Sequence, residues 1–515
     1  MRPPALGPQD AAALRADLHA GEYTVEGVEE VLGPVAAAAL DREQAVPARR
    51  VLRATREPVA TLLRAFVLGE PVQRRDLDVA LPRLGADGAR QGRLVRFAGE
   101  GADDECRAVV DLSPYAAQDA AGTVHWWLVS DVGELASGRP LAADHVLGVG
   151  GASTALARIT VRERVGRALD LGTGCGIQAL HATRHAGHVV ATDVSARALA
   201  FARLNAALAG AGLDLRHGSL LGPVAGERFD LVVSNPPFVI TPRTSESGLP
   251  RYTYRDGGGA GDALVRDLVE GLGEVLAPGG VAQLLGSWEH RRAEDWRERV
   301  EGWLAGSGLD GWVVQREVAD PGEYAETWLR DGGLTPDRDP VAWRDAYEAW
   351  LADFEARGVE AVGFGYVTLR RPAHAEPTLR RVEEHLGPVE DALGGHVATV
   401  LRTHEWLART DDAGLARTKL AVAADVTEER HLRPGDAEPH TIHLRQGSGF
   451  RRVAEASAAL AGLVGACDGD LEVGRLVAAV AELLDAPAEG LAATLLPAVR
   501  DLVRDGFLLP VGGAG

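Results

Sequence analysis

The spacing of apolar residues changes along the chain and divides it into regions. In the central region, short apolar runs typical of buried strands alternate with segments whose apolar residues recur every three or four positions, as in amphipathic helices. The strand-like runs are RALDLGTG, HVVATDVS, LDLRHGSL, FDLVVSNPPF and GVAQLLGSW. Because strands that alternate with long helices form parallel sheets covered by helices, this region predicts a doubly wound α/β fold.

Two further strand-like runs, GWVVQREV and VGFGYVTLR, end this region and are separated by a Trp-rich helical insert. The insert does not supply the helix order of a parallel crossover, so we expect an antiparallel last strand at an edge of the sheet. The tryptophans of the insert, Trp328, Trp343 and Trp350, are expected in the core rather than in a substrate cage.

The flanking regions carry mixed helix and strand patterns. In the N-terminal flank, REPVATLLRAFVLGEPVQRRDLDVAL resembles the helix–turn–helix core of a winged-helix fold, and Trp126 and Trp127 are expected to be buried beside a strand. In the C-terminal flank, three helical segments precede a short strand, which is again a winged-helix-like order. We therefore predict an N-terminal recognition domain over 1–140, a central α/β domain over 141–370 and a C-terminal winged-helix-like domain over 371–515.

The composition is that of a folded protein. Of 515 residues, 46% are hydrophobic and 25% are charged. The sequence contains no run of about 18 uncharged apolar residues, so we predict no membrane span. The N-terminus lacks the long apolar stretch of a secretory signal. The cysteines, Cys106, Cys175 and Cys467, are too far apart in sequence to suggest a disulfide framework or a clustered metal site. We expect a cytoplasmic enzyme that does not associate with membranes.

The net charge of the chain indicates which class of partner it can bind. The formal net charge is −20, and Lys419 is the only lysine among otherwise arginine-based cations. Such a surface repels a phosphate backbone unless basic residues cluster locally, so the charge favours a protein or small-molecule partner. The winged-helix-like flanks favour RNA or DNA instead.

A glycine-rich loop closes the first strand of the central region and opens a helix. It reads Asp170-Leu-Gly172-Thr173-Gly174-Cys175-Gly176. Glycines let the backbone turn tightly and approach a ligand. A carboxylate beside this turn would repel a pyrophosphate but can accept hydrogen bonds from an ammonium group. At the end of the next strand, Asp193 is placed to receive the two ribose hydroxyls of an adenosyl group.

Together, D-L-G-T-G-C-G, Asp193 and the later N-P-P-F resemble the class I S-adenosylmethionine-dependent methyltransferases. The resemblance implies a Rossmann-like methyltransferase sheet in the central, catalytic domain. It also implies S-adenosylmethionine as cofactor, S-adenosylhomocysteine as product, and no need for a metal. The residues it assigns to the cofactor are Asp170, Gly172, Thr173, Gly174 and Gly176 for the amino-acid part, Asp193 and Val194 for the ribose, and Asn235. After the third strand, Ser219 stands where the family usually has an acid that contacts the adenine amino group.

The motif Asn235-Pro236-Pro237-Phe238 interrupts an apolar strand at its carboxyl end. In open α/β sheets this edge lies beside the ligand. The side-chain carbonyl of Asn235 and the backbone carbonyl of Pro236 can each accept one N–H and so aim a planar nitrogen at the methyl group. Prolines make this turn rigid and remove competing donors, and Phe238 can stack on a planar group. The motif resembles that of methyltransferases acting on release-factor glutamine and on exocyclic amines of rRNA and DNA, which implies a planar nitrogen acceptor.

Two neighbouring segments are candidates for covering the ligands. The polar, glycine-rich stretch 241–261 follows the motif, and its residues Arg251, Tyr252, Tyr254 and Arg255 are candidate acceptor contacts. The segment DHVLGVGGASTAL, over 144–156, either covers the cofactor or links into a helix, and both interpretations stay open.

Several residues that could suggest other chemistry are interpreted as structural. His181 and His185 are spaced for one helical face, but no third metal ligand has suitable spacing, so we expect a solvent-exposed face. His440 and His443 are interpreted in the same way. Cys175 lies at a helix N-terminus but is expected to be structural.

The leading hypothesis is an S-adenosylmethionine-dependent N-methyltransferase that acts on a planar nitrogen of a macromolecule, RNA or protein. Three alternatives stay open. The first is a small-molecule or natural-product methyltransferase, and the second is a non-catalytic binding protein on a methyltransferase fold. The third, a nicotinamide-dependent oxidoreductase, is disfavoured by Asp170 and by the glycine spacing.

Overall fold

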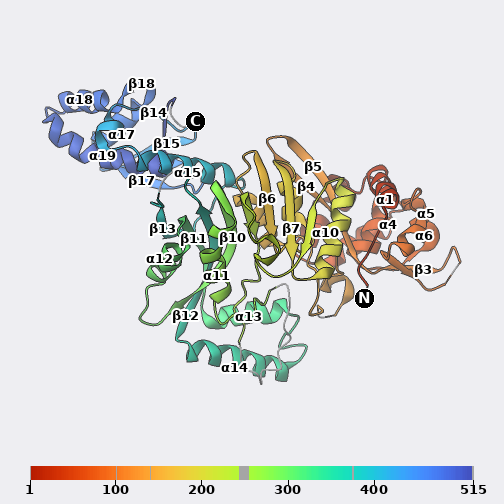
Figure 1. The fold of residues 1–515 in the computed structure, drawn as a ribbon. Helices are drawn as coiled ribbons and strands as arrows, with labels where there is room; N and C mark the ends of the chain where they lie inside the picture. The colour runs from red at the N-terminus through yellow and green to blue at the C-terminus, as the bar shows by residue number, and fades with distance from the viewer. Residues whose placement is uncertain (1, 100, 140, 243–254, 374–375, 513–515) are drawn as a thin grey trace. The chain divides into compact units, whose positions relative to one another are not determined.

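The computed structural model describes residues 2–99, 101–139, 141–242, 255–373 and 376–512. By contacts, the chain forms two compact units. The first comprises 1–157 with 163–383, the second comprises 158–162 with 384–515, and each is described by itself (Figure 1). None of the helices in these described ranges is both long and apolar enough to span a membrane. The division into three domains stays a prediction.

An eight-stranded sheet forms the centre of the first unit, in the order β13-β11-β12-β10-β9-β6-β7-β8. Its strands are β6 (Val165–Leu171), β7 (Ala186–Asp193), β8 (Asp214–His217), β9 (Phe229–Ser234), β10 (Leu276–Arg291), β11 (Asp310–Ala319), β12 (Val359–Arg370) and β13 (Arg380–Glu384). Neighbours from β8 to β10 pair in parallel, and β12 is antiparallel to both β10 and β11. The predicted mixed α/β sheet with an antiparallel strand is therefore confirmed.

The predicted edge position of VGFGYVTLR is wrong. This run forms β12, which lies between β10 and β11, and the edge is taken by β13. The reason is that β10 extends over 16 residues and pairs with β12 along most of its length, while β11 pairs with the other side of β12. A strand with partners on both sides satisfies all its backbone groups, which an edge strand does not.

Helices cover the sheet and contribute to separate apolar cores. One core contains side chains of α9 (Ile177–Ala182) and α10 (Ala196–Ala209), and another contains side chains of α11 (Ala263–Gly271) and α12 (Trp296–Ser307). Local signals fix α10: the Ser195 hydroxyl accepts the Ala198 N–H at its start, and Gly210 adopts a φ of 67° at its end. Shorter elements of this region are α8 (Gly151–Ile159), η2 (Gly222–Val224) and η3 (Leu272–Glu274).

The N-terminal elements share the core of α9 and α10. They are α1 (Pro8–Ala20), α2 (Val25–Leu40), α3 (Ala45–Leu52), α4 (Pro58–Leu62), η1 (Leu63–Val67), β1 (Val72–Gln73), α5 (Arg74–Ala80), α6 (Gly85–Gln91), β2 (Val95–Phe97), β3 (Glu105–Ala108), β4 (Asp111–Asp119), β5 (Gly122–Ser130) and α7 (Glu134–Ser137). Strands β1, β3 and β2 form one small sheet, and β4 pairs with β5. As predicted, Trp126 and Trp127 on β5 are buried.

The helical insert between β11 and β12 consists of α13 (Pro321–Asp331) and α14 (Pro340–Ala356). It packs against Val239 and Ile240, directly after the N-P-P-F motif. Trp350 lies in this core as predicted, whereas Trp328 and Trp343 are half-buried at its margin.

The second unit contains two small sheets, β18-β14-β19 and β15-β16-β17. Its elements are α15 (Gly394–Ala408), α16 (Asp412–Ala416), β14 (Lys419–Val422), β15 (Val426–His431), β16 (Thr441–Gln446), β17 (Val453–Ala456), α17 (Ala458–Gly465), β18 (Asp468–Glu472), α18 (Val473–Leu483), α19 (Ala488–Arg504) and β19 (Leu508–Pro510). The three predicted helices and the final strand correspond to α17, α18, α19 and β19.

Candidate active site

Four neighbouring strands end at one edge of the large sheet. Leu171 at the end of β6 pairs with Ser234 on one side and with Thr192 on the other. Asp193 on β7 pairs with His217 at the end of β8. The chain that follows these strand ends carries the glycine loop, Ser219 and the N-P-P-F motif, so the fold brings the predicted residues to one edge.

The glycine loop needs its glycines for two different reasons. Gly172, Gly174 and Gly176 have φ values of 75°, 56° and 92°, in the left-handed region that other residues rarely adopt. A Cβ on Gly172 or Gly174 would have no atom of the described chain within 4 Å, whereas one on Gly176 would lie 3.1 Å from the Cβ of Ala202. The first two glycines therefore leave a bare backbone for a ligand, and the third lets α10 pack closely.

Asp170 is a buried carboxyl that is only partly satisfied. Its Oδ2 accepts hydrogen bonds from the Thr173 hydroxyl at 2.6 Å and from the Ala179 N–H at 2.9 Å. Its Oδ1 is buried and has no hydrogen-bond partner among the residues that the structure describes. Burial raises the pKa of Asp170 to about 7, against the two hydrogen bonds, and the charge of Asp193 adds to the rise. An ammonium group would pair with the free oxygen, so the residues present fit the amino-acid part of S-adenosylmethionine.

Asp193 orders the same loop from the neighbouring strand. It accepts the Gly174 N–H at 2.9 Å and the Ser195 N–H at 2.7 Å. Burial raises the pKa of Asp193, although these two bonds oppose the rise. The half-buried carboxylate therefore stands beside the glycine turn, where an acid can receive ribose hydroxyls.

Beyond Asp193 the candidate adenine side of the site is open. Val194 is 55% exposed, and Ser219 is exposed after the end of β8. The two segments are held together because the Gly218 N–H donates to the Asp193 carbonyl at 3.0 Å and the His217 ring contacts the Val194 carbonyl at 2.9 Å. Ser219 offers a hydroxyl and backbone groups here, with no carboxylate.

The N-P-P-F motif is tied to the first strand by the residue that precedes it. The Ser234 hydroxyl donates to the Leu171 carbonyl at 2.8 Å. Asn235 is half-buried, and within the described part of the chain its Oδ1 is buried without a hydrogen-bond partner. Pro236 and Pro237 follow and donate no backbone hydrogen bond. The motif thus presents an unused acceptor at the edge where the glycine loop lies.

Phe238 is held by aromatic neighbours rather than lying free. Its ring centroid is 5.0 Å from that of Phe364 on β12 and 6.3 Å from that of Trp328 on α13. The Ser287 hydroxyl donates to its carbonyl. The half-buried ring keeps a partly open surface for contact with an acceptor.

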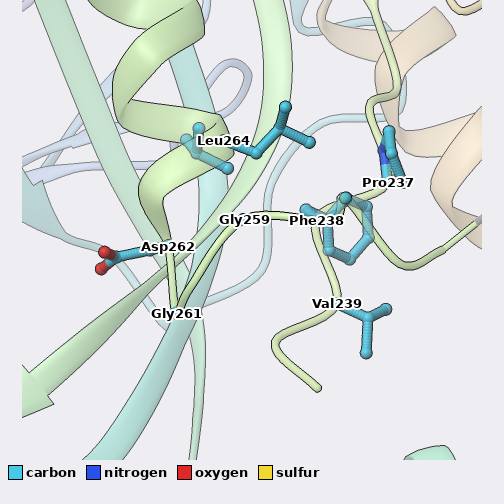
Figure 2. A pocket seen from close by; sticks show the side chains of 9 residues that line it. Pro237, Phe238, Val239, Gly259, Gly261, Asp262 and Leu264 are labelled. Atoms are coloured by element: carbon cyan, nitrogen blue, oxygen red, sulfur yellow. The ribbon is translucent and has the colours of Figure 1, made fainter. Parts of the chain in front are cut away.

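A small pocket lies between the motif and the glycine-rich segment before α11. Residues 237–239 line one side, and Gly259, Gly261 and Asp262 line the other (Figure 2). Gly257 also lines the pocket. A Cβ on Gly257 would lie only 2.7 Å from the Pro237 carbonyl oxygen. Glycine at this position therefore permits the close approach that shapes the pocket.

Of the predicted acceptor contacts, Arg251, Tyr252 and Tyr254 lie outside the described residues. Arg255 is buried, and its guanidinium donates to the Trp328 carbonyl at 2.8 Å and pairs with Asp331 at 2.9 Å. It fastens the segment after the motif to α13. No local sequence signal indicates this neighbour, because α13 lies more than 60 residues further along the chain.

The predictions for His181 and Cys175, two side chains beside the glycine loop, can be compared with the structure. The prediction that His181 is solvent-exposed is wrong: the ring is buried, and a 3.0 Å hydrogen bond joins it to the Tyr115 hydroxyl. The β4–β5 hairpin covers this helix face, which periodicity alone did not reveal. The structural interpretation of Cys175 is confirmed, since the thiol is buried and burial raises its pKa to about 11.

Comparison with known proteins assigns the region that holds this site. Residues 148–248 match the family of the methyltransferase small domain. The release factor glutamine methyltransferase of Geobacter sulfurreducens is 38% identical over 119 residues, which cover 22% of this chain and 42% of that protein. The central region is a class I S-adenosylmethionine-dependent methyltransferase domain. The predicted resemblance is thereby confirmed.

Further relatives of the methyltransferase domain agree. The release factor glutamine methyltransferase of Enterococcus faecalis is 45% identical over 73 residues, or 14% of this chain and 26% of that protein. The chain spans less than two thirds of the length of these curated relatives. The 16S rRNA N2 G1207 methyltransferase of T. Thermophilus aligns with 47% of this chain and 65% of its own, at 15% identity and a TM-score of 0.26, too low to support an inference.

The flanks match different families. Residues 20–108 match a domain of unknown function (DUF7059), and residues 398–510 match another (DUF7782). The methyltransferase domain is therefore combined with two separately recognised segments.

Proposed function

We propose that this protein transfers a methyl group from S-adenosylmethionine to the planar amide nitrogen of a protein side chain. One observation carries the proposal: the buried Oδ1 of Asn235 and the buried Oδ1 of Asp170 lie at the same sheet edge, and neither has a hydrogen-bond partner among the described residues. A buried acceptor without a hydrogen bond destabilises the folded protein, so we expect a bound ligand to donate a hydrogen bond to each oxygen. An ammonium group suits Asp170, and an N–H of the acceptor suits Asn235.

The residues then divide the work between the two ligands. Asp170 and the bare backbone of the glycine loop hold the amino-acid part of the cofactor, Asp193 and Val194 line its ribose, and Ser219 borders its adenine. When bound, the cofactor supplies a methyl group on a positively charged sulfur. Asn235 accepts one N–H of the acceptor and the Pro236 carbonyl accepts the other, which turns the nitrogen lone pair toward the methyl carbon. Bound there, S-adenosylmethionine would supply the methyl group, and its transfer from sulfur to the nitrogen would leave a neutral thioether and release one proton from the nitrogen to solvent.

Both oxygens also favour the transition state over the bound substrates. An amide nitrogen gains positive charge as it attacks, and fixed carbonyl dipoles stabilise that charge. The prolines keep these dipoles in place, and Phe238 packs on the planar acceptor group.

Two observations favour a protein amide. The relatives with 38% and 45% identity are named for release factor glutamine. The net charge is −20, which disfavours a phosphate backbone as partner.

An exocyclic amine of an RNA base is the second candidate. The observation in its favour is the sheet order β1-β3-β2 beside α4, α5 and α6, which supports a winged-helix-like recognition domain within 1–140. The helices and strand α17, α18, α19 and β19 support the same interpretation of 371–515.

The test uses cofactor with a radiolabelled methyl group, the full chain and a cell extract, followed by protease or nuclease digestion. We expect label that protease removes, and nuclease-sensitive label would favour RNA. Asn235→Ala should lower turnover by about 10²-fold and leave cofactor affinity within a few-fold in calorimetry. Unchanged turnover in this variant, or no cofactor binding by the wild type, would overturn the proposal.

A further inference from the structure

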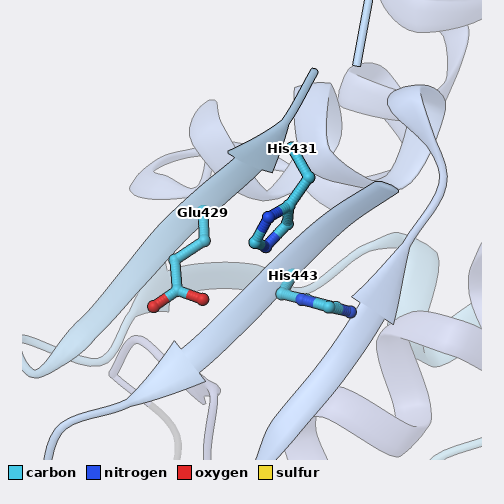
Figure 3. Close-up of side chains that lie close together, drawn as sticks. All are labelled: Glu429, His431 and His443. Carbon is cyan, nitrogen blue, oxygen red and sulfur yellow. The ribbon is translucent and has the colours of Figure 1, made fainter. Parts of the chain in front are cut away.

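We infer that the outer face of the β15–β16 hairpin, in the second unit, is a zinc-binding site formed by Glu429, His431 and His443. The three side chains come from two adjacent strands (Figure 3). This site is separate from the methyltransferase domain and does not depend on the proposed function.

The strand register brings the three side chains together. Glu429 pairs directly with His443 across the antiparallel ladder. Side chains two residues apart on a strand share a face, so His431 lies on the same side as Glu429. The ligand atoms of the three residues all lie within 4.8 Å of one another, and the two imidazole centroids are 5.2 Å apart. A zinc ion binds such ligand atoms at about 2.0–2.2 Å. The three ligand atoms therefore need to move only slightly toward one another to bind the same ion.

The ligand set is chemically suited to zinc. Two imidazoles and one carboxylate form the three-ligand zinc sites that keep a fourth position open. His431 is exposed, while Glu429 and His443 are half-buried, so a metal ion can reach the site from solvent. On the other side of His443, Glu455 on β17 is its direct partner in the ladder and lies on the same face. Water or Glu455 can therefore take the fourth position.

The Glu429 carboxylate is paired with a neighbouring arginine. Arg445 donates to both oxygens of Glu429, at 2.8 and 3.2 Å. Both partners of this ion pair are substantially exposed, and exposed ion pairs are weak. Zinc can thus displace Arg445, and removing Arg445 should tighten zinc binding.

A neighbouring histidine provides a matched control. His440 lies on the same hairpin, and its N–H donates to the His431 carbonyl at 3.0 Å, but it is not part of the cluster. The sequence analysis interpreted His440 and His443 as structural residues of a helical face, whereas His443 lies on a strand and the register places it beside residues of β15.

The test is calorimetric titration of the tag-free full chain with zinc chloride after removal of metal by a chelator. We expect one zinc ion per chain in the wild type. His431→Ala and His443→Ala should each weaken binding at least about tenfold, Arg445→Gln should tighten it several-fold, and His440→Ala should leave it unchanged. Far-ultraviolet circular dichroism checks that each variant is folded.

X-ray absorption of the zinc-loaded protein should show nitrogen and oxygen ligands only, at about 2.0–2.2 Å. No zinc binding by the wild type overturns the inference, as does equal binding in His431→Ala and His443→Ala. Cofactor binding, measured in the same variants, should be unchanged, and this separates the zinc site from the methyltransferase site.

Discussion

The Ser234 hydroxyl donates a hydrogen bond to the Leu171 carbonyl oxygen at 2.8 Å. The bond joins the last residue of β9, which Asn235 follows, to the last residue of β6, which the glycine loop follows. The relative position of these two strand ends therefore depends in part on this buried contact.

Ser234→Ala should lower turnover about tenfold or more, because reaction rates are sensitive to small misalignments of the acceptor. Cofactor affinity should change little, since the glycine loop keeps its own bonds to Thr192. Ser307→Ala is the control: it removes a hydroxyl at the end of α12, away from the site, that donates to the Leu304 carbonyl at 2.7 Å and accepts the Leu309 N–H at 3.1 Å. Ser234→Ala should lose about 1 kcal/mol of stability and Ser307→Ala about 1–2 kcal/mol, but only Ser234→Ala should lose turnover in steady-state kinetics.

The buried carboxyl of Asp170 predicts a pH dependence of cofactor binding. Its pKa of about 7 in the free protein means that it is mostly protonated below neutrality, whereas an ammonium group needs the ionised form. Affinity for S-adenosylmethionine should therefore rise about tenfold per pH unit up to about pH 7 and then level off. Calorimetry between about pH 5.5 and 8.5 measures this; Asp170→Asn should bind weakly with a flat profile.

The Asp170 carboxyl has the opposite effect on folding stability: its contribution should fall as the pH rises, whereas cofactor affinity should increase. Because the folded-state pKa is raised above the ordinary value of 3.8, the folded protein holds a proton that the unfolded chain has released. Without cofactor, the contribution of this carboxyl to stability should be complete below about pH 4 and fall by about 1.4 kcal/mol per pH unit toward pH 7, in addition to any contribution from Asp111, whose pKa burial also raises to about 7. Thermal melting of the wild type should show this slope, and Asp170→Asn should reduce it. An equal slope in both proteins would assign it to other groups.

The sequence predicted the parts of this site that are local. Apolar runs specify strands, and Asp170, Asp193 and Asn235 stand at their ends, so a parallel sheet must bring them to one edge. The glycines could be recognised because their positive φ values exclude most other residues.

The features that the sequence did not predict depend on distant chain segments. The position of β12 depends on which strands it pairs with, and its own sequence does not specify them. The burial of His181 depends on Tyr115, 66 residues earlier. The attachment of Arg255 to α13 likewise follows from packing between segments that local periodicity does not relate.

Asn205 is a further residue that only the structure reveals. Its fully buried side chain accepts the Val129 N–H at 2.8 Å and donates to the carbonyls of Val129 at 2.9 Å and Cys175 at 2.8 Å. It joins β5 and α10 to the glycine loop. Asn205→Ala should lower the opening free energy of the Val129 amide by about 2–4 kcal/mol, because three buried bonds are lost.

Hydrogen exchange of the β5 segment measures this change. Cofactor affinity should fall as well, since the Cys175 carbonyl belongs to the loop. Gln178→Ala serves as the comparison, because it removes one hydrogen bond of 2.7 Å to the Ser153 carbonyl. It should lower the free energy of unfolding by about 1 kcal/mol. Equal losses in the two variants would mean that Asn205 does not act as a three-way link.

Gly257 tests whether the small pocket beside Pro237 takes the methyl acceptor. A Cβ at this position would lie 2.7 Å from the Pro237 carbonyl oxygen, and a backbone group cannot yield as a flexible side chain can. Gly257→Ala should therefore push 237–239 away from the glycine-rich segment and lower turnover by up to about 10²-fold, since a displacement of about 1 Å can have that effect.

In Gly259→Ala, two residues along the same segment, the new Cβ would meet its nearest neighbours at 3.4 Å, so turnover should fall far less. Cofactor affinity should be preserved in both variants, because the atoms nearest to the new Cβ belong to Pro237, Ala263 and Leu264 and not to the glycine loop. Single-turnover kinetics with saturating cofactor separates these effects. If Gly257→Ala instead weakens cofactor binding and spares the chemical step, the pocket beside Pro237 belongs to the cofactor and not to the acceptor.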